Sequence, residues 1–124
     1  MAEKLKKMGI YSIEFIPLRN SPEVLEDYAS YFFNQGFIVT FGSEHNTPQL
    51  TPLRLYTRNG AHLSEPLREI NYKGACIIAA HQYLFAVMGK GFLKEDGTPE
   101  MDKMDEYVTL GDALIRFRIN NEER

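Results

Sequence analysis

The chain has 124 residues, of which 44% are apolar, 12% aromatic and 25% charged, which is typical of a soluble globular domain. It is too short for a complete eight-fold β/α barrel, which needs about 200 residues or more. The 14 basic and 17 acidic side chains give a net charge of −3, so neither nucleic acid nor an anionic membrane surface is an expected partner.

No stretch of the sequence predicts a membrane span or a secretion signal. The longest apolar run, residues 75–80, is far shorter than the roughly 18 residues that a span requires. Residues 1–8 lack the apolar region of a signal peptide, so we expect a cytoplasmic protein. The single cysteine, Cys76, lies in the apolar run and is expected to be a buried, inert thiol.

The first part of the chain alternates between helix and strand patterns. Residues 2–8 have the spacing of a short helix, and residues 10–16 are typical of a mostly buried strand that Pro17 ends. Ser21 and Pro22 form a helix start, because serine caps a helix and proline suits its first position. Residues 37–41 again have the pattern of a buried strand.

This order predicts a βαβ unit with two parallel strands. The helix and the short loops between the two strands form a βαβ crossover. Such crossovers are right-handed in almost all proteins, so we expect the same hand here. The carboxyl ends of both strands then meet at one edge, and the loops at residues 17–20 and 42–47 should lie side by side. In α/β folds this edge is where ligands bind.

The pattern after residue 47 is mostly helical. A long buried helix fits the apolar residues from 67 to 88, but a break at residues 72–74, followed by a strand over 75–80, fits them equally well. The acidic stretch at residues 95–106 is expected to be a solvated face, with a helix start at residues 98–100. A final helix is predicted over residues 110–118.

The loop after the second predicted strand contains Glu44, His45 and Asn46. Carboxylate oxygen and imidazole nitrogen are ligands that zinc, manganese and iron accept, so Glu44 and His45 are candidate ligands of a divalent metal. Asn46 is a candidate substrate-binding residue beside them. The alternative is ordinary turn chemistry, in which Asn46 or Thr47 caps the segment that follows.

Three polar residues of the first strand and its loop are further candidates. Glu14 lies among apolar neighbours, so it would either support the metal ligands, pair with Arg19, or occupy an exposed position at the sheet edge. Arg19 and Asn20 follow the strand and are candidate substrate-binding residues, because an arginine fork suits phosphate. A solvated loop arginine is the alternative. His62 and His81 form no motif, and His81 is expected to be a hydrogen-bonded core histidine.

Three short motifs in residues 9–46 carry a family resemblance: Ile13-Glu14-Phe15, Asn20-Ser21-Pro22-Glu23 and Gly42-Ser43-Glu44-His45. Their order and spacing resemble the closing βαβ unit of the PHP (polymerase and histidinol phosphatase) family. Its members are distorted β/α barrels that bind metal ions at the carboxyl ends of their strands and hydrolyse phosphate esters. The resemblance implies that Glu44 takes the place of an aspartate ligand and His45 lies near a histidine ligand. Two differences are that Glu44 and His45 are adjacent and that the family's amino-terminal His-x-His is missing.

The sequence thus predicts an α/β fold: an incomplete, PHP-like β/α barrel over residues 1–46, with a mostly helical C-terminal extension over residues 47–124 packed on it. The expected function is that of a fragment or C-terminal part of a metal-dependent phosphoesterase, inactive alone, acting on a phosphorylated small molecule when a larger parent chain completes it.

Two alternatives stay open. The first is a small, non-catalytic α/β interaction module that forms a homo-oligomer through its exposed sheet edges. The second is a small-molecule-binding domain that holds an anion with Arg19, Asn20 and the loop that begins at Gly42.

Overall fold

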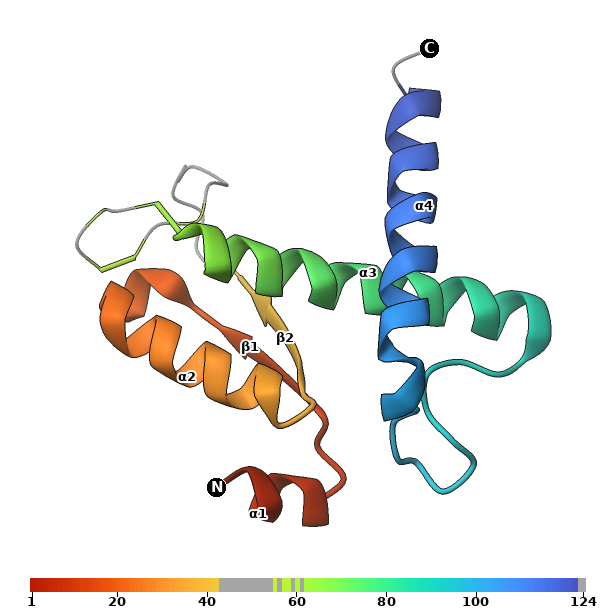
Figure 1. Ribbon diagram of the computed structural model, residues 1–124, viewed down its shortest axis with the longest axis horizontal. Coiled ribbons are helices and arrows are strands. Elements are labelled where there is room, and N and C mark those ends of the chain that lie inside the picture. The colour runs from red at the N-terminus through yellow and green to blue at the C-terminus, as the bar shows by residue number, and fades with distance from the viewer. Residues whose placement is uncertain (43–54, 56, 59, 61, 123–124) are drawn as a thin grey trace, which may run out of the picture. The chain divides into compact units, whose positions relative to one another are not determined.

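The computed structural model describes residues 1–42, 55, 57–58, 60 and 62–122. The described chain is a mixed α/β protein of mostly helical content (Figure 1). Its elements, in order, are α1 (Ala2–Lys7), β1 (Ser12–Phe15), the 3-10 helix η1 (Pro17–Arg19), α2 (Pro22–Asn34), β2 (Ile38–Phe41), α3 (Glu65–Met88), the 3-10 helix η2 (Met101–Lys103) and α4 (Met104–Glu122).

The chain forms two compact units. The first, here called the sheet unit, is Ser12–Asn71; the second, the helical unit, consists of Met1–Tyr11 and Tyr72–Arg124. Helix α3 contributes its first residues to the sheet unit and the rest to the helical unit. The division predicted after residue 46 falls outside the described residues.

The sheet unit contains the predicted βαβ arrangement. Strands β1 and β2 are parallel, with Ser12 opposite Ile38 and Phe15 opposite Phe41. Ser21 caps α2, since its side-chain oxygen accepts a hydrogen bond from the backbone N–H of Val24 at 3.4 Å. The prediction of two parallel strands joined by a helix is therefore confirmed. The sheet of the described residues has these two strands, so a barrel stays a prediction.

Helix α2 lies against one face of the sheet (Figure 1), and aromatic side chains pack between the two. The ring centroids of Phe15 and Phe32 are 6.2 Å apart, and those of Phe32 and Phe37 are 5.2 Å apart with the rings edge to face. Leu25 and Val39 are fully buried in the same core. This core fixes the strand faces: Ile13 and Phe15 point toward α2, and Ser12 and Glu14 alternate with them and are exposed.

Residues 65–88 form one continuous helix, so the long helix is confirmed and the strand over residues 75–80 is wrong. The expected burial is confirmed only in part, because Ile78, Phe85 and Met88 are exposed. Within the helical unit, Cys76, Ile77 and Ala80 are buried. Their spacing places them on one stripe of the helix, so the helix buries part of this apolar run while Ala75 and Ile78 stay exposed. The expected burial of Cys76 is confirmed.

In the helical unit, a loop and the 3-10 helix η2 lead from α3 into α4. Phe92, 1% exposed, packs edge to face on Tyr107 with ring centroids 5.0 Å apart. Helix α4 begins at Met104 and reaches Glu122, so the predicted bounds of 110–118 were too narrow at both ends. The preceding 3-10 turn η2 explains the early start, because it leads directly into the α-helix. Asp102, Asp105 and Glu106 of the acidic stretch are exposed, as expected.

No helix within the described ranges combines the length and apolarity that a bilayer span needs.

Candidate functional site

The predicted ligand site lies at the carboxyl ends of β1 and β2. The backbone N–H of Gly42 donates to the carbonyl oxygen of Phe15 at 2.9 Å, so the two strands end together. Glu44, His45 and Asn46 lie outside the described residues. Among the residues that are described, no three His, Cys, Asp or Glu side chains come together as a metal site.

Glu14 is exposed on β1 and its side chain lies over Gly42. A Cβ atom added at Gly42 would be only 2.9 Å from the carboxyl carbon of Glu14. Gly42 therefore leaves room for this carboxylate at the end of β2, and any other residue there would displace it. The structure thus brings Glu14 next to the residue from which the predicted metal-binding loop begins.

Arg19 and Asn20 are joined to Arg58, a residue that the sequence analysis did not single out. The Asn20 side-chain amide donates to the carbonyl oxygen of Ile16 at 2.9 Å. The backbone N–H of Arg58 donates to the Asn20 carbonyl at 2.8 Å, and its guanidinium donates to the Arg19 carbonyl. These contacts hold the loop after β1 in place. A turn at residues 58–60 was the only sequence signal for this contact.

On the outer edge of β1, no strand of the described residues pairs with the backbone. The Phe15 carbonyl faces β2, and in a strand alternate residues direct their N–H and C=O to opposite edges. The backbone groups of Ser12 and Glu14 therefore point away from β2. Within the described part of the chain, β2 is the strand that pairs with β1, and both Ser12 and Glu14 are exposed.

The outer edge of β2 differs, because a side chain of α3 covers part of it. The backbone N–H of Phe41 donates to Oδ1 of Asn71 at 2.9 Å. Asn71 thereby satisfies a donor that would otherwise be available to an added strand. Among the described residues, the two edges of this small sheet therefore differ: the Asn71 side chain bonds the outer edge of β2, whereas no strand pairs with the outer edge of β1.

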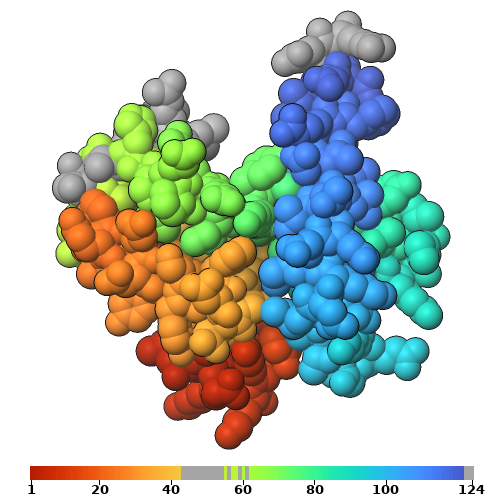
Figure 2. Space-filling view, in the orientation of Figure 1, coloured from red at the N-terminus to blue at the C-terminus, as the bar shows by residue number. Residues whose placement is uncertain are grey.

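The helical unit carries an apolar groove of about 930 Å³ between α3 and α4. Its lining combines apolar side chains with polar ones: Ala79, Gln82, Tyr83, Leu114, Ile115, Phe117, Arg118, Ile119 and Asn121. Phe117 is 70% exposed and Ile119 is 50% exposed. The surface of α4, blue in Figure 2, therefore includes large apolar side chains that are open to solvent.

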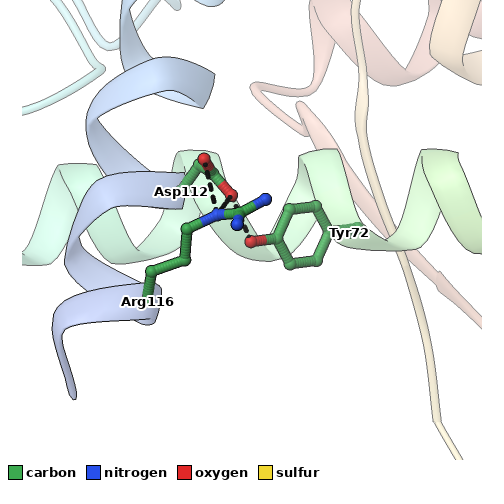
Figure 3. Close-up of polar contacts among 3 residues, drawn as sticks. All are labelled: Tyr72, Asp112 and Arg116. Atoms are coloured by element: carbon green, nitrogen blue, oxygen red, sulfur yellow. Dashed lines mark hydrogen bonds and ion pairs between the residues drawn. The ribbon is translucent and has the colours of Figure 1, made fainter. Parts of the chain in front are cut away.

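Tyr72, Asp112 and Arg116 form a polar cluster in the helical unit (Figure 3). The Tyr72 hydroxyl donates to Asp112 at 2.5 Å, and Nε of Arg116 donates to the same carboxylate at 2.9 Å. The hydrogen bond to Asp112 raises the pKa of Tyr72 to about 12. The Tyr72 and Arg116 hydrogen bonds lower the pKa of Asp112. A neutral tyrosine and a fully charged ion pair make this cluster a link between α3 and α4 rather than a source of a general base.

His81 and Cys76 have side chains of types that can act in catalysis, but both have structural roles here. The backbone N–H of Phe92 donates to Nδ1 of His81 at 2.8 Å, and the His81 ring stacks on Phe85 at 5.9 Å. Burial raises the pKa of the Cys76 thiol, which disfavours the reactive thiolate. The predicted hydrogen bond of His81 is thus confirmed, but the residue is half-buried and not part of the core.

Comparisons of this chain with protein-family models, with curated proteins and with solved structures gave no match.

Proposed function

We propose that this chain is a non-catalytic interaction module that forms a homo-oligomer through the open edge of its sheet. The observation that carries this proposal is the exposed outer edge of β1, where the backbone groups of Ser12 and Glu14 point away from β2. Unpaired strand edges bind further strands, and natural proteins otherwise cover them. Here Asn71 covers part of β2, whereas no described strand pairs with the outer edge of β1.

The helical unit supports the same class of function. The groove between α3 and α4 leaves Tyr83, Phe117 and Ile119 exposed. Exposed apolar patches rimmed by polar residues are typical of surfaces that bind other proteins. Two polar side chains of the helical unit, in contrast, are already hydrogen-bonded: His81 to the Phe92 backbone and Asp112 to Tyr72.

Sedimentation of the purified chain over a wide concentration range tests the proposal. The wild type is expected to form an oligomer, and Glu14→Pro to be monomeric with an unchanged circular dichroism spectrum. Proline removes the N–H that points away from β2, and the N–H groups that face β2 stay in place. Glu14→Ala is the matched control, because it removes the same carboxylate and keeps the N–H. A wild type that is monomeric at every concentration would contradict the proposal.

We propose as a second candidate a part of a PHP-like metal-dependent phosphoesterase. Two features support it: the parallel strands end together, and the Glu14 carboxylate lies at Gly42, directly before the stretch that holds Glu44 and His45. Such a site would bind zinc, manganese or iron and polarise a phosphate ester. Metal analysis tests it: the wild type should retain a divalent metal after dialysis, and His45→Ala should lose it. Equal metal content in both proteins would rule this candidate out.

A further inference from the structure

The outer edge of β1 is complementary to itself in one particular register. We propose that β1 pairs antiparallel with β1 of a second copy, so that Ser12 of each copy lies opposite Glu14 of the other. The inference rests on the proposed self-association and names the partner and its geometry. It follows from the direction of the backbone groups and from the two exposed side chains.

The backbone restricts the registers. In an antiparallel pair, two opposite residues exchange both of their N–H···O=C bonds when their backbone groups point toward each other. On β1 these residues are Ser12 and Glu14, because Phe15 faces β2. Three registers are therefore compatible with strand pairing: Ser12 opposite Ser12, Ser12 opposite Glu14, and Glu14 opposite Glu14.

The side chains select among the three registers. Glu14 opposite Glu14 brings like charges together, which destabilises a strand pair. In the register with Ser12 opposite Ser12, only Ser12 lies opposite a residue of the other β1. Glu14 then lies opposite Ile10, which is outside the strand. The mixed register uses both outward residues of each copy. It also places Ser12 opposite Glu14 twice by symmetry, so that the Ser12 hydroxyl can donate to the Glu14 carboxylate once that side chain turns from Gly42 toward the outer edge.

The pairing gives a closed dimer. The joined sheet has the strand order β2-β1-β1-β2, and half-buried Ile13 lies opposite Ile13 of the other copy. A two-stranded sheet is only marginally stable by itself. Joining two such sheets gives four strands and should therefore stabilise both. The Asn71 contact at Phe41 covers part of β2, which opposes further growth at the ends of the joined sheet.

A matched pair of charge variants at Ser12 tests the register. Ser12→Lys places a positive charge opposite Glu14 and should tighten the dimer, whereas Ser12→Glu places like charges together and should weaken it. Each effect acts twice by symmetry, so the dimer dissociation constant should change by about two- to thirty-fold in each direction at low salt. Both positions are exposed, so the two variants should fold like the wild type.

The other registers give different results. If Ser12 lay opposite Ser12, both variants would bring like charges together and both would weaken the dimer. If Glu14 lay opposite Glu14, Ser12 would lie opposite Ile16 and the sign of its charge would have little effect. Either result overturns the proposed register while leaving self-association in place. A wild type without any dimer contradicts the proposed function itself, so the two failures are distinguishable.

Disulfide trapping gives an independent measurement. Ser12→Cys and Glu14→Cys proteins are mixed and oxidised together. The proposed register brings the new thiol of one variant opposite the new thiol of the other, so the mixed disulfide should exceed both homodisulfides. Opposite residues in an antiparallel pair have Cα atoms about 5.5 Å apart, which suits a disulfide. Wild-type protein, whose Cys76 is buried, is the control. A statistical mixture of the three disulfides overturns the register.

Discussion

Gly111 of α4 lies against the backbone of Cys76 in α3: a Cβ atom added at Gly111 would overlap the Cys76 carbonyl oxygen. Helices α3 and α4 are therefore in backbone contact at this point. Only glycine permits such an approach, since any side chain would occupy the space of the opposite helix. Gly111 is itself buried, although it lies in the middle of a long helix where glycine is unfavourable.

Gly111→Ala should therefore destabilise the protein, although the same change in an exposed helix stabilises it by about 1 kcal/mol. We expect a loss of about 1–3 kcal/mol or more in the free energy of unfolding, because the helices must separate. Chemical denaturation measures it. Thr109→Ala, at an exposed position of the same helix, is the control and should change stability by at most about 0.5 kcal/mol. A more stable Gly111→Ala protein would show that the helices do not touch here.

The hydrogen bond from Phe92 to His81 gives a second prediction. His81→Phe keeps a ring that can stack on Phe85 but removes the acceptor for the Phe92 N–H. An unpaired buried donor costs about 1–3 kcal/mol, so the variant should be less stable by this amount. Hydrogen exchange at the Phe92 amide should also become faster. Gln82→Ala, exposed on the same helix, is the control. Unchanged exchange at Phe92 would contradict the contact.

Asn71 is expected to stabilise the sheet unit and to protect its edge. Asn71→Ala removes the acceptor of the Phe41 N–H and should cost about 1–3 kcal/mol, whereas Asn71→Asp retains an oxygen acceptor and should be much closer to the wild type. The alanine variant also frees a donor on the outer edge of β2. Light scattering should therefore detect assemblies larger than those of the wild type. Equal stability of the two variants would contradict this role.

The contacts of Asp112 with Tyr72 and Arg116 predict how the stability of the protein depends on pH in the acid range. Hydrogen bonds from Tyr72 and Arg116 lower the pKa of Asp112 in the folded protein, so the charged form favours folding. This contribution is present above the ordinary pKa of aspartate and is lost as the pH falls through the lowered value. The melting temperature of the wild type should exceed that of Asp112→Asn near neutral pH, and the difference should shrink in acid. A constant difference would contradict the charged contact.

Tyr72 predicts the behaviour at the alkaline end. Its hydrogen bond to Asp112 raises its pKa to about 12, so it should ionise at a higher pH than an ordinary tyrosine. The stabilising contribution of the neutral phenol is present below the ordinary value and is lost as the pH rises through about 12. In a pH titration followed by tyrosinate absorbance, the wild type should show an ionisation step near pH 12 that Tyr72→Phe lacks. Far-ultraviolet circular dichroism of the same samples would report whether the fold persists. If both proteins showed the same ionisation step near pH 12, that step would belong to another tyrosine.

Local sequence signals predicted the βαβ unit well. Ser21 and Pro22 predicted where α2 begins, and apolar runs flanked by proline or glycine predicted both strands. Parallel pairing followed from chain order alone, since a helix between two strands returns the chain in the same direction. The candidate residues Glu14, Arg19 and Asn20 were placed correctly at or after β1, but their contacts with Gly42 and Arg58 were not anticipated.

What the sequence by itself determined is the set of elements that depend on neighbouring residues: caps, periodicity and strand direction. The choice between helix and strand at residues 75–80, the acceptor that Asn71 offers to Phe41, and the approach of Gly111 to Cys76 depend on residues far apart in the chain. Only the tertiary structure decides these, because a hydrogen bond or a close contact between distant segments has no local pattern. The open edge of β1 belongs to the same class, as its exposure depends on what the rest of the fold covers.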